Sequence, residues 1–153
     1  LLTVRAPRPA GGERGPGRWS HRYLWARQEV SGRWSVEELG QAGSELYQGQ
    51  PDYCGLGTID PDDPTRVVVS ADVHPGSGLP LRSAADGQVH HQLFEGRRGA
   101  EQRWTWTSLT PDPTEDHLRT VLVRSVGHRA LAWMRGTYRA YDDFDTQIVV
   151  RIA

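Results

Sequence analysis

Groups that can bind or transfer protons to an acidic ligand gather at the end of one apolar run near position 134. Guanidinium, phenol and carboxylate side chains fall within eleven positions there: Arg135, Tyr138, Arg139, Tyr141, Asp142, Asp143 and Asp145. The fork of an arginine fits a carboxylate, and a tyrosine or histidine can transfer a proton. This cluster is interpreted as one wall of a binding site. The alternative is a loop-stabilising ion pair between Arg135 and Asp142 or Asp143.

Five residues at the ends of expected strands are the candidate ligand-binding side chains: Arg119, Arg135, Tyr138, Tyr53 and His91. Arg119 opens one expected strand and Arg135 closes the next, so an antiparallel hairpin brings both to the same edge. Two guanidinium groups there, beside Tyr138, would clamp a carboxylate. Two simpler interpretations stay open: Arg119 neutralising Glu115 and Asp116, and Tyr53 packing in the core.

The sequence gives little support for a metal site. His90 and His91 are adjacent in an expected strand and would point to opposite faces, so at most one can face a given site. The "DPDD" segment at 60–63 lacks the spaced oxygen ligands of a calcium loop and indicates a turn. No cofactor is expected, although the intact protein could hold a structural calcium ion.

Composition excludes several classes of partner. The formal net charge is -1, which gives no bulk attraction to nucleic acid or to an anionic membrane. No run has the length of a transmembrane helix. The six Trp and five Tyr suit a carbohydrate surface and a β-sheet core equally well. Cys54 is the single cysteine, so no intrachain disulfide can form.

Short apolar and aromatic runs separated by turn residues predict an all-β, antiparallel chain. The expected strands are 21–28, 33–39, 53–60, 66–72, 88–96, 103–109, 118–125, 129–136 and 144–153. The nearest approach to a helical pattern, 36–43, is short and interrupted by glycine. Long polar connections are expected at 40–52, 73–87, 110–118 and 136–143. Strand alternation places all four at one end of the sheets, where binding residues tend to collect.

A repeat underlies this order of strands. Residues 21–39 match 91–109 with His21 on His91 and Trp34 on Trp104, and the hairpin that follows each copy recurs as well. Each unit has the four antiparallel strands of a propeller blade. We therefore expect residues 1–18 to be a strand remnant and a flexible loop. Residues 19–153 are expected to hold about two blades and part of another, too few to close a ring.

Five segments in order resemble the C-terminal part of bacterial BNR-repeat β-propellers, a group related to ulvan lyases and rhamnose–glucuronate lyases. They begin "HRYLWARQEVSGRW", "AGSELYQGQPDYCGLGTIDPDDP", "HHQLFEG", "RWTWTSLTPDPTEDHLR" and "LAWMRGTYRAYDDFDTQ". "GAEQRW" and "SGRW" keep the Trp of the family's Asp-box turn but lose its Asp. The resemblance covers residues 20–153.

The resemblance implies a seven-bladed, extracellular or periplasmic propeller that acts on or binds acidic, uronate-containing polysaccharide, with β-elimination as the reaction of its lyase members. The other blades would then be N-terminal parts of the same chain, carrying the catalytic His, and this piece alone would be inactive. Two alternatives remain. One is a non-catalytic glycan-binding propeller. The other is a glycoside hydrolase, for which Asp72 and Asp142 are the available carboxylate pair.

Overall fold

The computed structural model describes residues 1–7, 19–47, 49–50, 52–125 and 127–152, which contain ten strands and no helix. The strands are β1 (Leu2–Pro7), β2 (Trp19–Gln28), β3 (Trp34–Gly43), β4 (Gly57–Ile59), β5 (Arg66–Ala71), β6 (Gln92–Arg98), β7 (Trp104–Ser108), β8 (Asp116–Ser125), β9 (His128–Ala140) and β10 (Asp143–Ile152). The all-β prediction is confirmed. The segment 36–43, nearest to a helical pattern, belongs to β3.

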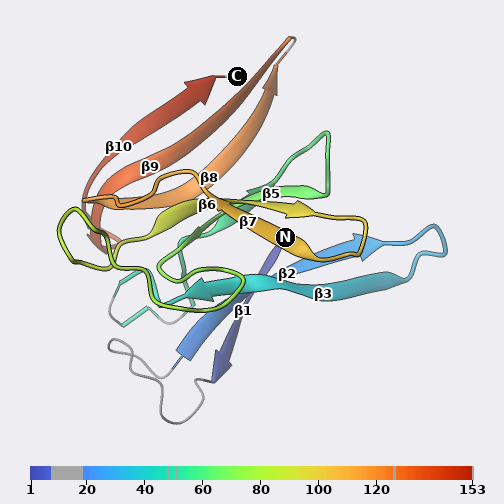
Figure 1. The fold of residues 1–153 in the computed structure, drawn as a ribbon, viewed down its shortest axis with the longest axis horizontal. Helices are drawn as coiled ribbons and strands as arrows, with labels where there is room; N and C mark the ends of the chain where they lie inside the picture. The colour runs from blue at the N-terminus through green and yellow to red at the C-terminus, as the bar shows by residue number, and fades with distance from the viewer. Residues whose placement is uncertain (8–18, 48, 51, 126, 153) are drawn as a thin grey trace.

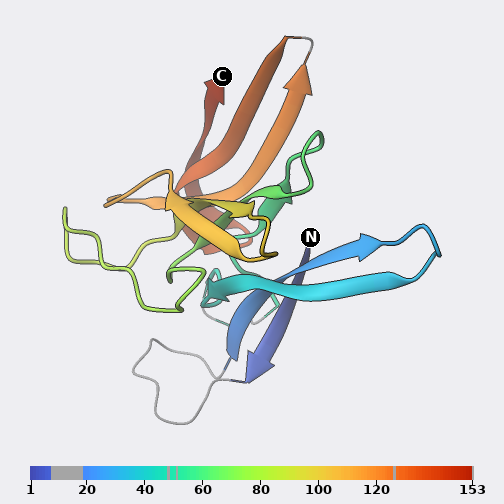
Figure 2. The ribbon, with the colours of Figure 1, turned by 45° about the vertical axis from the view of Figure 1, so that its right-hand side comes forward.

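The strands form three antiparallel sheets that follow one another along the chain. The first is β1-β2-β3, the middle sheet is β4-β5-β6-β7, and the third is β8-β9-β10. Figure 1 shows the middle sheet between the other two, and the turned view in Figure 2 keeps that order. The arrangement is an open, propeller-like stack.

The boundary between sheets falls elsewhere than the repeat suggested. The hairpin β4–β5 shares a sheet with the β6–β7 hairpin that follows it, through the pairing of β5 with β6. The repeat of residues 21–39 in 91–109 predicts instead that β4–β5 shares a sheet with the preceding hairpin β2–β3. Both groupings satisfy the same order of strands, and only the long-range pairing of β5 distinguishes them.

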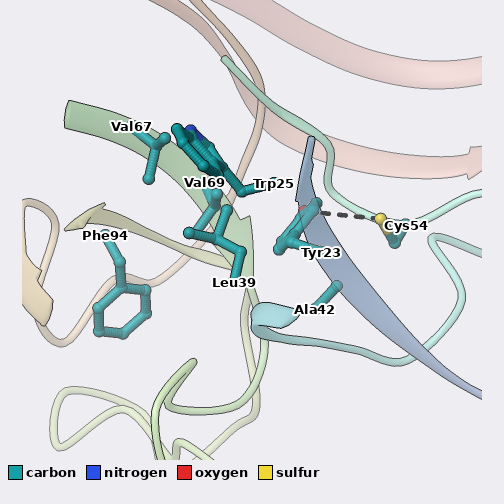
Figure 3. Packing of buried hydrophobic residues seen from close by; sticks show 8 residues of the cluster. All are labelled: Tyr23, Trp25, Leu39, Ala42, Cys54, Val67, Val69 and Phe94. Carbon is teal, nitrogen blue, oxygen red and sulfur yellow. Dashed lines mark hydrogen bonds between the residues drawn. The ribbon is translucent and has the colours of Figure 1, made fainter. Parts of the chain in front are cut away.

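Two apolar layers hold the sheets together. Between the first and middle sheets lie Tyr23, Trp25, Leu39, Ala42, Cys54, Val67, Val69 and Phe94 (Figure 3). Between the middle and third sheets lie Val68, Leu93, Leu131 and Trp133. Because alternate residues of a strand point to opposite faces, β5 supplies both layers and needs an unbroken apolar run. That requirement explains the sequence "VVV" at 67–69.

Three long connections meet at one end of the stack: 44–56, 72–91 and 109–115. We call this the long-loop end. The expected long connection at 136–143 is wrong, because β9 continues to Ala140 and a turn at Tyr141–Asp142 leads directly into β10. The opposite end carries the short connections 29–33, 60–65, 99–103 and 126–127.

Candidate functional site

Arg119 lies at the long-loop end of β8, in a bulge between Leu118 and Val121. Its φ angle is 52°, and its N–H donates to the Gly55 carbonyl at 2.8 Å. A positive φ strains a residue with a side chain. However, Leu56 has a φ angle of 66° at the equivalent place before β4. The same backbone bend therefore occurs at the start of the middle and third sheets, and at Arg119 it sets the direction in which the side chain leaves the strand.

The Arg119 guanidinium has no carboxylate partner among the described residues. It donates to the Tyr138 hydroxyl at 3.4 Å, and its Cζ lies 5.2 Å from the Tyr138 ring centroid. Its buried Nε meets no acceptor in the described part of the chain. Glu115 instead pairs with Arg135 and Asp116 with His91, so the expected alternative of Arg119 neutralising them does not occur.

Tyr138 provides the rigid support for this guanidinium. The ring is buried and packs with Leu46, Leu118 and Met134. It lies between two other rings: its centroid is 5.7 Å from that of Tyr47 and 5.6 Å from that of Phe144. A side chain packed on this many sides has little freedom to reorient. Arg119 is thus a positive charge held on an aromatic platform.

Arg135 lies at the same end of the hairpin but on the other face of the sheet. It pairs with His117 on β8 and with Gln147 on β10, and its Nε lies 3.3 Å from Glu115. Three positions separate it from Tyr138 along an unbroken register, so the two side chains point in opposite directions. Arg119 and Arg135 therefore do not form one clamp. The ion pair expected between Arg135 and Asp143 is made by Arg139, at 2.7 Å.

His91 is buried between the middle and third sheets and links them. Its N–H donates to Asp116 Oδ1 at 2.8 Å, and its Nδ1 lies 3.5 Å from the same oxygen. Burial alone would lower the pKa of His91, but the hydrogen bond and charge of Asp116, together with the charge of Asp72, raise it above its ordinary value. His91 is therefore placed to join sheets rather than to meet a ligand in solvent.

His90 also faces Asp116, contrary to the expectation from strand alternation. Its Nδ1 lies 3.9 Å from Asp116 Oδ1, and its Nε2 lies 2.7 Å from Asp86. The two histidines precede β6, which begins at Gln92, so the rule of opposite faces does not apply to them.

Tyr53 belongs to the 44–56 connection and is 45% exposed, so it is not a packed core tyrosine. Its carbonyl accepts from the Leu46 N–H at 2.9 Å. Leu46 in turn packs against Tyr138. Tyr53 therefore stabilises the loop that supports Tyr138, and within the described residues its ring makes no recorded contact with Arg119.

His117 was not anticipated from the sequence, where the strand was expected to begin at Leu118. The Trp133 indole N–H donates to His117 Nδ1 at 2.8 Å. An indole nitrogen is only a donor, so Nδ1 must be unprotonated and Nε2 carries the proton. Burial, followed by the charge of Arg135, lowers the pKa of His117. No spacing in the sequence signals this pair, because it depends on the β8–β9 register.

The aspartates at 60–63 bind arginines. Asp60 pairs with Arg66 at 2.8 Å, Asp62 with Arg124 at 2.7 Å, and Arg129 lies within 3.6 Å of both carboxylates. These contacts join the middle sheet to the third at the short-loop end. In the described residues no group of His, Cys, Asp and Glu has the arrangement of a metal site.

Asp72, one of the two carboxylates considered for glycoside hydrolysis, already accepts hydrogen bonds from the protein itself. Its carboxylate accepts from the Ser44 N–H at 3.0 Å and from the Ser44 hydroxyl. Asp142 lies in the exposed β9–β10 turn.

Comparison with known proteins adds no relative: no family model, curated protein or solved structure matches this chain. Over the described ranges, no helix is long and apolar enough to cross a membrane.

Proposed function

We propose that this chain is part of a carbohydrate-active β-propeller that binds acidic polysaccharide, and that Arg119 holds the carboxylate of a uronate residue. The observation that carries the proposal is the Arg119 guanidinium, which meets no carboxylate within the described residues and is supported on the Tyr138 ring at the long-loop end. A forked, permanently charged donor suits a carboxylate. The acidic polysaccharide class also follows from the family resemblance, as does a location outside the cytoplasm.

Arg135 is the matched control for this assignment. It lies on the same hairpin and carries the same charge, but Glu115 already partners it. Arg119→Gln should therefore weaken binding of a glucuronate-containing polysaccharide roughly ten- to a hundredfold, the usual loss for a charge-assisted contact. Arg135→Gln should have a much smaller effect. Isothermal titration of both variants against that polysaccharide and a neutral glycan would measure this.

Two outcomes would count against the site. Equal losses in both variants would show a general effect of net charge. A loss for the neutral glycan as well would show that Arg119→Gln disturbs the fold around Tyr138. Arg119→Lys provides a second check, since a single ammonium keeps the charge but not the fork and should restore binding only in part.

One contact favours β-elimination over simple binding as the activity of the complete protein. An elimination needs a cation on the uronate carboxylate and a base at the neighbouring C5 proton. The Tyr138 hydroxyl lies 3.4 Å from the Arg119 guanidinium, so one ligand could reach both groups. Tyr138→Phe should then abolish formation of the unsaturated product while Arg119-dependent binding persists. Loss of binding in that variant would assign Tyr138 to support alone.

A further inference from the structure

The third sheet presents an apolar face that no other described strand covers. The exposed side chains on this face are Val121, Val123, Ile148, Val150 and Ile152. The pairing registers place them together: Val121 and Val150 both lie opposite Ala132, and Val123 and Ile152 both lie opposite Ala130. Exposed apolar patches of this kind mark association surfaces. We call this the leading face of the third sheet.

The middle sheet shows what covers the equivalent face. In the middle sheet, Val69 pairs with Phe94, and both face the first sheet. In the third sheet, Trp133 pairs with Val149 in the same way, and both face the middle sheet. The neighbouring residues Leu93 and Ile148 therefore occupy equivalent positions on the leading faces. Leu93 is 0% exposed because Leu131 and Trp133 cover it, whereas Ile148 is 69% exposed.

Within the described ranges, a complementary apolar face is exposed at the other end of the stack. Trp34, which is 62% exposed, and Val36 lie on the face of β3 directed away from the middle sheet. The repeat equates them with Trp104 and Trp106, which pack against the core between the first and middle sheets. We call this the trailing face of the first sheet. In both internal interfaces of the chain, the trailing face of one sheet lies on the leading face of the sheet before it.

We propose that a second copy of this chain binds head to tail, with its trailing face around Trp34 covering the leading face around Ile148. The contact repeats the two interfaces already present within the chain. Such a contact is heterologous, so a dimer as a whole retains one free face of each kind and association continues until a ring closes. This inference rests on the sheet packing and is independent of carbohydrate binding.

Sedimentation velocity over a concentration series tests the proposal. The wild-type mass should rise with concentration, and Ile148→Arg and Trp34→Arg should each prevent this. An equimolar mixture of the two variants should form a dimer and no larger species. In that mixture one copy supplies an intact Trp34 face, the other an intact Ile148 face, and both altered faces point outward. Val30→Arg, at the exposed tip of the β2–β3 turn, adds the same charge and should associate like the wild type.

Two results would overturn it. A wild-type protein that stays monomeric at every concentration would show that no second copy binds the leading face. Continued dimerisation of Trp34→Arg alone would show that two leading faces pair with each other. Val36→Glu and Val150→Glu repeat the mixing experiment with other residues of the same faces, so misfolding of one variant cannot decide the outcome.

Discussion

At the scale of single residues, ion pairing decides which of the candidate side chains is available to a ligand. Arg119, Arg135 and Tyr138 lie near one end of the β8–β9 hairpin, as the expected strand order implies, but they do not form the expected clamp. The sequence could not show that Arg119 lies on the same face as Tyr138 and not on that of Arg135, because that depends on where the bulge in β8 falls. It also could not reveal which cations pair with Glu115 and Asp116, since Arg119 is near both along the chain while Arg135 and His91 reach them only in the folded structure.

The His91–Asp116 contact makes a prediction about pH. The pKa of His91 is raised, so its contribution to stability is complete below the ordinary value of 6.5 and is lost as pH rises through the higher folded value. The pKa of Asp116 is lowered by His91 despite burial, so its contribution is complete above 3.8 and is lost as pH falls through the lower folded value. The coupling should therefore be greatest between these two pH values.

A double-mutant cycle measures that coupling. Urea unfolding of the wild type, His91→Gln, Asp116→Asn and the double variant should give a coupling free energy of about 1 kcal/mol at pH 5. It should be smaller at pH 3 and at pH 9. The cycle removes the separate, opposite effect of His117, whose pKa is lowered. A coupling that does not change with pH would mean that the contact is not ionic.

At the scale of elements, the strands could be predicted and their grouping into sheets could not. Alternation and turn residues located most strand positions, because those signals are local. Exceptions show where tertiary contacts prevail: the expected strand 53–60 is reduced to Gly57–Ile59, and β9 extends past Gly136 to Ala140. Neither the association of β5 with β6 nor the trapping of His91 between sheets has a local signal.

Leu93 and Ile148, at equivalent positions of the middle and third sheets, give a direct test of this grouping of strands into sheets. Leu93→Ala should lower the free energy of unfolding by about 2–5 kcal/mol, the usual loss for a fully buried side chain. Ile148→Ala, at the equivalent exposed position, should change it by no more than about 0.5 kcal/mol. Both values come from denaturant unfolding at a protein concentration low enough to keep the chain monomeric. Similar losses would mean that the third sheet is covered in solution.

At the scale of the whole molecule, the described strands form a short stack of three antiparallel sheets, with the Arg119 guanidinium at the long-loop end. Repeated units depend on neighbours to bury their faces, and in the described residues the apolar side chains around Ile148 and Trp34 are exposed. Tyr138 and Phe144 lie beside the leading face, and Phe144 is itself exposed. A sheet placed on that face would therefore border the Arg119 site and could supply further ligand contacts.

The central claim is that Arg119 binds the uronate carboxylate and not the rest of the sugar, and one titration tests it. The same glucuronate-containing polysaccharide would be compared by isothermal titration calorimetry before and after chemical reduction of its uronates to neutral sugars. If Arg119 binds a carboxylate, the wild-type chain should bind the native polymer at least ten times more tightly than the reduced one. Arg119→Gln should bind both polymers equally weakly. Equal affinity of the wild type for the native and reduced polymers would contradict the account.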